Sequence, residues 1–237
     1  MNIAHIDNIS VNGDSVIHKS GVTAKIIFAV FILSGFLFST EINKVLLLGV
    51  ILIIASIISR IPPGTAFGLL IYPLFFSSFF ALLIIRESPQ EGLLIILKAT
   101  GAAYSMIWLI LTTPYIEIFS ILSLIFPSVI IDILFFTYRS FFILLEKMEN
   151  IMKSIKLKGG YHFWDIIKNL KNIAGIIGLL IIHSFEMSER MYKIYSLRGY
   201  DGKLPQGDVK IIRGKKDYFI ILAGIAAFTG VIIPWSI

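Results

Sequence analysis

Long apolar runs dominate this sequence and limit what the chain can fold into. Runs without acidic residues occupy residues 25–39, 44–59, 66–85, 92–113 and 218–235. A helix crosses a bilayer core with about 20 apolar residues, and the first two runs are slightly shorter than this. Hydrophobic residues make up 57% of the chain and charged residues 15%, whereas a soluble domain carries roughly a quarter charged residues. The sequence therefore predicts an all-α integral membrane protein with about five transmembrane helices.

Basic residues are concentrated in one stretch. Of the 21 Lys and Arg, fifteen lie in residues 139–217, together with eight acidic residues. Because cytoplasmic loops of membrane proteins are enriched in Lys and Arg, we expect this stretch to lie in the cytoplasm. With five spans, the N-terminus is then cytoplasmic and the C-terminus external. The expected division is transmembrane helices in 1–113, a cytoplasmic region in 114–217 and a last transmembrane helix in 218–237.

Two further apolar runs, 129–145 and 174–185, affect this topology. The second run has twelve residues, or about 18 Å of helix, which is too short for a bilayer core of about 30 Å. We expect both runs to be the buried halves of long helices that lie under or partly inside the membrane. The alternative is that the two runs pair with each other as a tight hairpin. Lys98 lies alone within the fourth span, where a lysine either snorkels, pairs with a carboxylate or has a function.

The sequence repeats itself at an offset of 40 residues within the basic stretch. Residues 146–160 read EKMENIMKSIKLKGG, and residues 186–200 read EMSERMYKIYSLRGY. Six aligned positions match in type: Glu146 with Glu186, Glu149 with Glu189, Lys153 with Lys193, Leu157 with Leu197, Lys158 with Arg198, and Gly159 with Gly199.

Each copy has the pattern of the last turns of an amphipathic helix. Glutamate and lysine four residues apart, as in Glu149 with Lys153 and Glu189 with Lys193, form pairs worth about 0.3 to 0.5 kcal/mol each. A glycine is favoured just after a helix because it tolerates the left-handed conformation. A cation beside that glycine complements the negative end of the helix dipole. For a single copy, helix capping alone is therefore enough to explain the cation beside the glycine.

The duplication favours a second interpretation, in which the two tips fit equivalent sockets on a two-fold symmetric partner. Leucine supplies an apolar anchor, and the guanidinium of Arg198 is able to grip a carboxylate with two parallel hydrogen bonds. Lys158 makes only a point-charge contact. The first socket is therefore expected to be weaker or less demanding in geometry than the second.

The segment from Glu186 to Gly202, EMSERMYKIYSLRGYDG, resembles the Ser-Glu-Arg…Ala-Arg-Gly-Tyr-Asp-Gly segment of energy-coupling factor (ECF) transporter T components. The match is best with the CbiQ (cobalt) branch and covers effectively the whole chain. Supporting matches are Leu157-Lys158-Gly159, Thr112-Thr113-Pro114, Tyr138-Arg139, and His18 to Lys25.

The resemblance implies a non-enzymatic coupling subunit of an ABC importer. Two long cytoplasmic coupling helices cross in an X, and their tips enter grooves on two ATPase subunits. ATP binds to those subunits, and their closure moves the tips and, through the helices, a separate substrate-binding membrane subunit. The resemblance assigns Leu157, Lys158 and Gly159 to the first tip, and Leu197, Arg198 and Gly199 to the second. The chain departs from the family by having leucine where alanine is usual and Lys158 where arginine is usual.

We expect no cofactor or metal on this chain, with cobalt or nickel as cargo and a vitamin as a further option. The sequence contains no phosphate-binding loop of the Gly-x-x-x-x-Gly-Lys-Ser/Thr type, and its four histidines, His5, His18, His162 and His183, lack metal-ligand spacing. Basic residues in the cytoplasmic region are suited to lipid headgroups, and no fold signature points to nucleic acid.

Two other classes of function remain. A membrane enzyme acting on lipid or isoprenoid would need clustered acidic or histidine residues, for which the sequence offers Glu186 with Glu189 as a near pair. A secondary transporter would show inverted repeats, whereas this repeat runs in one sense.

Overall fold

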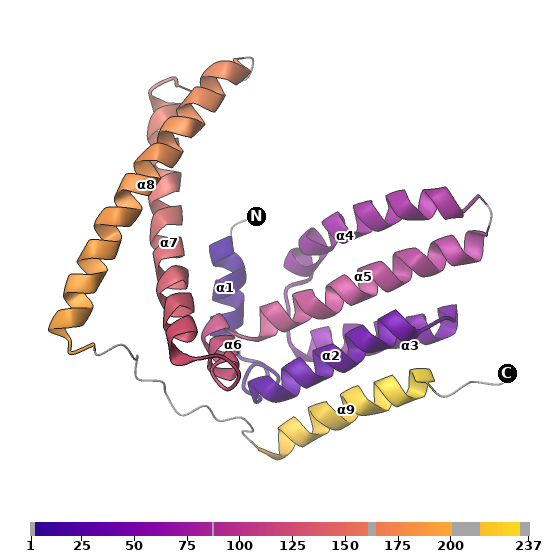
Figure 1. The fold of residues 1–237 in the computed structure, drawn as a ribbon. Helices are drawn as coiled ribbons and strands as arrows, with labels where there is room; N and C mark the ends of the chain where they lie inside the picture. The colour runs from indigo at the N-terminus through magenta and orange to yellow at the C-terminus, as the bar shows by residue number, and fades with distance from the viewer. Residues whose placement is uncertain (1–2, 87, 161–164, 201–213, 233–237) are drawn as a thin grey trace. The chain divides into compact units, whose positions relative to one another are not determined.

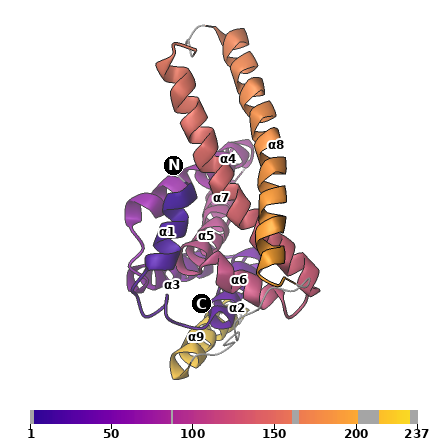
Figure 2. The same cartoon turned by 90° about the vertical axis from the view of Figure 1, so that its left-hand side faces the viewer.

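The computed structural model describes residues 3–86, 88–160, 165–200 and 214–232, and the described part of the chain is helical without strands (Figures 1 and 2). The helices in chain order are α1 (Ile3–Asn12), α2 (Val22–Phe38), α3 (Ile42–Ile58), α4 (Pro63–Ile84), α5 (Pro89–Thr112), α6 (Tyr115–Leu122), α7 (Ser128–Leu157), α8 (Ile166–Leu197) and α9 (Lys215–Ile232).

The chain divides into two compact units. The first consists of 1–121 with 208–237 and contains α1 to α6 and α9, and the second, 122–207, contains α7 and α8. The second unit lies within the region 114–217 that the sequence sets apart as cytoplasmic.

Five helices coincide with the five predicted spans. Helices α2, α3, α4, α5 and α9 begin and end within a few residues of the apolar runs. Both α4 and α5 have a proline in their first turn, where its missing N–H would have had no partner in any case. The all-α prediction is confirmed.

Four helices in the described part of the chain, α4, α5, α7 and α8, are long and apolar enough to cross a membrane, and α2 and α3 are shorter. The run 129–145 lies inside α7 and the run 174–185 inside α8, so both are parts of long helices, as expected. The 18 Å estimated for the second run counted only its apolar residues. Helix α8 has 32 residues, or about 48 Å, so length does not prevent it from crossing. The sidedness of the chain stays a prediction.

Helix α2 forms the centre of the first unit. It packs against α9, α5 and α3, while α4 and α5 form an antiparallel pair (Figure 1). Phe28 of α2 contacts Trp108 of α5, with ring centroids 5.2 Å apart. The indole N–H of Trp108 donates to Ser59 Oγ at 3.1 Å, and Tyr104 OH donates to Ser56 Oγ at 2.6 Å. Helix α5 is therefore tied to α3 by hydrogen bonds between side chains, which suit an apolar surrounding.

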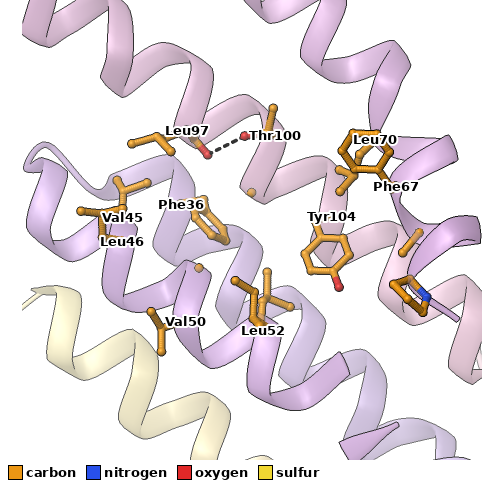
Figure 3. A pocket seen from close by; sticks show the side chains of 15 residues that line it. Phe36, Val45, Leu46, Val50, Leu52, Phe67, Leu70, Leu97, Thr100 and Tyr104 are labelled. Atoms are coloured by element: carbon orange, nitrogen blue, oxygen red, sulfur yellow. Dashed lines mark hydrogen bonds between the residues drawn. The ribbon is translucent and has the colours of Figure 1, made fainter. Parts of the chain in front are cut away.

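An apolar groove lies between α3, α4 and α5. It has a volume of about 480 Å³ and its lining includes Phe36 of α2 (Figure 3). The hydroxyls of Thr100 and Tyr104 are the only polar side-chain groups in the lining. The phenylalanines of α4 between residues 75 and 80 are exposed, as expected of a lipid-facing surface.

Glycine allows α5 to approach α2. A Cβ at Gly101 would lie 2.3 Å from Cε1 of Phe36, and Phe36 is itself only 1% exposed. An added methyl at this position would therefore have to displace the ring of Phe36.

We predict that Gly101→Ala lowers the free energy of unfolding by about 1 to 3 kcal/mol, because the added methyl overpacks this contact. Gly49→Ala is the matched control, since nothing lies within 4 Å of a Cβ at that helical position. The measurement is the thermal unfolding midpoint of the purified protein in detergent. Equal midpoints for the two variants would contradict this account of the packing.

Candidate functional site

The two repeated segments lie at opposite ends of one helix pair. Helices α7 and α8 pack against each other and run antiparallel, and they cross in the view of Figure 1. The first tip follows the end of α7 at Leu157, and the second follows the end of α8 at Leu197. Because α8 begins beside the first tip and has 32 residues, about 48 Å of helix separates the two tips.

The first tip ends α7 with a Schellman cap, in which a left-handed glycine lets two N–H groups turn back onto the last carbonyls. Gly159 has a φ of +70°. Its N–H donates to the carbonyl of Lys156 at 3.1 Å, and the N–H of Gly160 donates to the carbonyl of Ile155 at 2.9 Å. Carbonyls that would otherwise have no partner at the helix end are thereby satisfied.

The second tip has the same cap, displaced by 40 residues. Gly199 has a φ of +77°. Its N–H donates to the carbonyl of Ser196 at 3.1 Å, and the N–H of Tyr200 donates to the carbonyl of Tyr195 at 3.0 Å. The sequence repeat is thus a repeat of backbone geometry, and the predicted role of both glycines as helix terminators is confirmed.

The leucine and the cation at each tip are exposed. Leu157 is 88% exposed and Leu197 is 89% exposed. Lys158 and Arg198 are exposed as well, and a Cβ at either tip glycine would meet nothing within 4 Å. Because these leucines stay exposed, they add no hydrophobic stabilisation to the fold. Each tip therefore presents an apolar side chain beside a cation, and both are accessible to a partner.

The predicted ion pairs within the helices are not formed. Within the described residues, neither Glu149 with Lys153 nor Glu189 with Lys193 comes within the 4.0 Å limit for an ion pair. Exposed pairs of this kind gain little Coulomb energy against the entropy of two long side chains, so the spacing alone does not hold them together. Glu186 instead pairs with Nδ1 of His183 at 3.0 Å.

The second tip is braced by side chains that the sequence did not assign. The guanidinium of Arg139 donates to Tyr195 OH at 3.1 Å, and Tyr200 OH donates to Asp132 Oδ2 at 3.0 Å. The ring of Phe136 lies 4.8 Å from that of Tyr195 and 5.9 Å from that of Tyr200. Tyr138-Arg139 was visible in the sequence as a family match, but its contact 56 residues away leaves no local signal.

The first tip has a simpler brace at the start of α8. The side-chain amide of Asn172 donates to the carbonyl of Gly160. Asp165 caps α8 by accepting from the N–H of Lys168 at 3.1 Å.

In the first unit, two other segments of the family resemblance are joined. Lys25, which is fully buried, donates from Nζ to the carbonyl of His18 at 3.1 Å and to that of Thr112 at 2.8 Å. Nε2 of His18 lies 3.2 Å from the carbonyl of Leu111. The carbonyls of Leu111 and Thr112 belong to the last turn of α5, where a cation and an N–H group replace the missing helical donors.

A buried carboxylate completes this junction on the side of α9. Asp217, in the first turn of α9, accepts from the N–H of Gly21 at 2.8 Å and from the N–H of Gly214 at 3.2 Å. The segment before α2 is thus bound to both α5 and α9. The sequence interpretation singled out Lys98, which is half-buried on α5. It named Lys25 only within a family match and assigned no role to Lys25 or Asp217, because their partners are distant in sequence.

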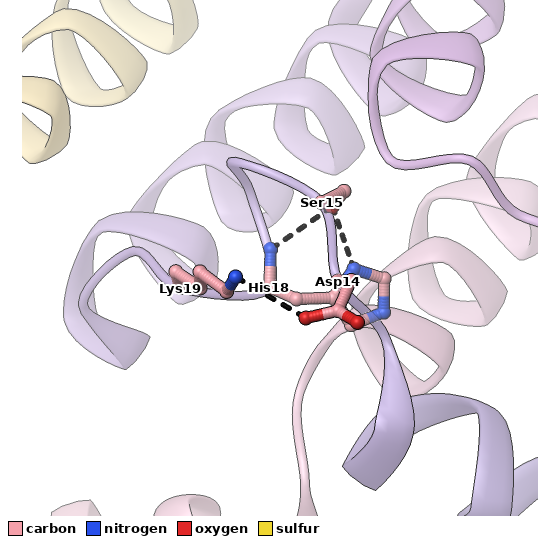
Figure 4. Close-up of polar contacts among 4 residues, drawn as sticks. All are labelled: Asp14, Ser15, His18 and Lys19. Carbon is pink, nitrogen blue, oxygen red and sulfur yellow. Dashed lines mark hydrogen bonds and ion pairs between the residues drawn. The ribbon is translucent and has the colours of Figure 1, made fainter.

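His18 is held as a neutral ring. Nδ1 lies 2.6 Å from Ser15 Oγ (Figure 4), so a ring with its proton on Nε2 donates to Leu111 and accepts from the serine. Desolvation by burial lowers the pKa of His18 below its ordinary value of 6.5. The hydrogen bond to Leu111 opposes this shift, and the positive charge of Lys25 adds to it.

No group of three or more His, Cys, Asp or Glu side chains able to hold a metal ion occurs among the residues that the structure describes. His162 and the side chain of His5 lie outside those residues.

Comparison with known proteins gives related sequences. A family model described as CbiQ, cobalt transport protein, matches residues 13–210. A protein of Methanocorpusculum labreanum named as a fused cobalt transport protein, CbiMQ, is 26% identical over 179 residues, covering 65% of this chain and 29% of that protein. An uncharacterized protein of Methanocaldococcus jannaschii is 28% identical over 126 residues, covering 53% of this chain and 46% of its own length. The chain thus spans less than half the length of either relative.

We predict that the protein loses stability on acidification because of His18. A pKa lowered in the folded state means that the unfolded chain binds the proton more tightly. The contribution of His18 to stability is therefore fully present above pH 6.5 and is lost as the pH drops toward the folded pKa. Thermal unfolding midpoints in detergent between about pH 5 and 8 measure this. His18→Gln should remove much of the slope in that window, and an unchanged slope would contradict the assignment.

Proposed function

Since the chain belongs to the CbiQ family of cobalt transport proteins and is a multi-pass membrane protein, we propose that it is the coupling (T) component of an ECF-type ATP-driven importer. In this role it binds two ATPase subunits through its tips and transmits their closure to a substrate-binding membrane subunit. It performs no chemistry of its own.

One observation carries this proposal: two exposed Leu-cation-Gly tips with the same cap geometry at opposite ends of an antiparallel helix pair. A two-fold partner offers the same socket twice. Duplicated tips separated by about 48 Å of helix suit such a partner, whereas helix capping alone does not require the leucines to be exposed.

The geometry suits transmission of force. Each tip is the end of a long helix, and each cap fixes the direction in which its cation leaves the helix. When the ATPase subunits close around ATP, both ends of the α7 and α8 pair are displaced together. ATP is bound and hydrolysed on the partners, and the pair delivers the motion to the membrane.

The two tips differ in chemistry. Arg198 presents a planar fork that matches a carboxylate with two parallel hydrogen bonds, and Lys158 presents a single ammonium. We propose that the second tip makes the geometrically demanding contact and that the first makes the weaker one.

Cobalt is the proposed cargo, supported by the names of the family and of the fused relative. Nickel or a vitamin are the other candidates from the sequence. The metal ligands are assigned to the substrate-binding partner. The relative's name joins the labels CbiM and CbiQ, which supports a CbiM-type partner. We further propose a cell-membrane location with the tips in the cytoplasm, the N-terminus cytoplasmic and the C-terminus external.

Reversal of the charge at the second tip tests this function. Arg198→Glu should reduce co-purification of the ATPase subunits about tenfold or more, because a desolvated interface charge is replaced by its opposite. Arg190→Glu is the matched control, as it makes the same charge change at an exposed position of the same helix. Lys158→Glu should have a smaller effect. Assembly and cobalt uptake that survive Arg198→Glu would count against the coupling role.

A further inference from the structure

The two tips share a cap but differ in the residue that closes it. In the Schellman cap, the residue that follows the left-handed glycine donates the outer hydrogen bond. This residue is Gly160 at the first tip and Tyr200 at the second. Glycine has no side chain, so this residue contributes only its backbone to the first cap. The side chain of Tyr200 extends the second cap into contact with α7.

Tyr200 enters a cluster that we call the clasp, made of Asp132, Phe136 and Arg139 of α7 with Tyr195 and Tyr200. Two hydrogen bonds connect the helices, from Tyr200 OH to Asp132 at 3.0 Å and from Arg139 to Tyr195 OH at 3.1 Å. The ring of Phe136 meets both tyrosines edge to face, and the two tyrosine rings are 6.0 Å apart. Such ring contacts fix relative orientation as well as distance.

The clasp lies beside the residue that is proposed to bind the ATPase. Arg198 stands between Tyr195 and Tyr200 in the chain, and the N–H of Tyr200 bonds to the carbonyl of Tyr195 at 3.0 Å. A displacement of Arg198 therefore moves two tyrosines that are both bound to α7. The last turn of α8 is unable to unwind without breaking these contacts.

Among the residues that the structure describes, the first tip makes a different contact with its neighbouring helix. At that end of the pair, Gly160 accepts one hydrogen bond from Asn172, and a Cβ at Gly159 would meet nothing within 4 Å. In the described part of the chain, the second tip is thus tied to α7 by two side-chain hydrogen bonds and by ring contacts, whereas the first tip is tied to α8 by one hydrogen bond from Asn172.

We propose that Asp132 and Tyr200 are positioning residues that hold the second tip in register with α7 and pass its displacement to the N-terminal part of α7. From there the chain leads back through α6 to α5. This inference rests on the proposed function and adds the route by which the motion of one tip leaves α8. The clasp transmits force and makes no contact with ATP or cargo.

The experiment compares assembly with coupling in the complete complex. Tyr200→Phe keeps the ring and removes the hydroxyl, and Asp132→Ala removes the acceptor. Both variants should retain co-purified ATPase within about twofold, while cobalt(II) uptake per ATP hydrolysed falls roughly tenfold, the factor for the loss of one hydrogen bond. Asp132→Asn retains an acceptor oxygen for Tyr200 and should therefore keep the coupling of the unmodified protein. Tyr192→Phe is the control, because this tyrosine lies on the same helix and is 76% exposed.

Either of two results would overturn the proposal. Normal uptake per ATP in both Tyr200→Phe and Asp132→Ala would show that the clasp does not transmit motion. Loss of the ATPase from both, as expected for Arg198→Glu, would show that the clasp only keeps the tip folded. If Asp132→Ala lowers the yield of protein, Tyr200→Phe decides, since it preserves the packing of the ring. If the clasp variants transport normally but Arg198→Glu still abolishes assembly, the clasp proposal is wrong and the proposed function stands.

Discussion

A left-handed glycine at the end of each of the two longest helices is the constraint from which the proposed mechanism follows. At Gly159 and Gly199 the backbone adopts positive φ, and the chain reverses while the last carbonyls keep their hydrogen bonds. Beside this reversal, each helix end presents an exposed leucine and an exposed cation. Exposed tips on capped, rigid helices are what a subunit needs if it is to respond to the motion of a partner.

The first unit supplies a fixed frame through buried polar contacts. Lys25 and His18 cap the end of α5, and Asp217 binds the backbone before α2 to the start of α9. A buried charge without such partners would cost several kcal/mol, so these groups hold the helices in one arrangement. Close contacts at glycine, such as Gly101 against Phe36, add packing that is specific to this arrangement.

The sequence predicts the helices well because each relies on local signals. Apolar runs mark α2 to α5 and α9 to within a few residues, and Gly159 and Gly199 mark where α7 and α8 end. Contacts between distant residues leave no such signal. The bond of Lys25 to Thr112 joins residues 87 positions apart, and that of Tyr200 to Asp132 joins residues 68 apart. The pairs of Glu149 with Lys153 and Glu189 with Lys193 failed for the opposite reason, since correct spacing on an exposed helix does not by itself bring two flexible side chains together.

Site-specific cross-linking from the tips tests the central claim most directly. The chain contains no cysteine, so Leu157→Cys and Leu197→Cys each introduce a single thiol at an exposed position. In the assembled transporter, each thiol should cross-link to an ATPase subunit, and a chain carrying both should capture two copies. Thiols that capture no ATPase and react with a membrane-impermeant reagent added outside intact cells would contradict the account.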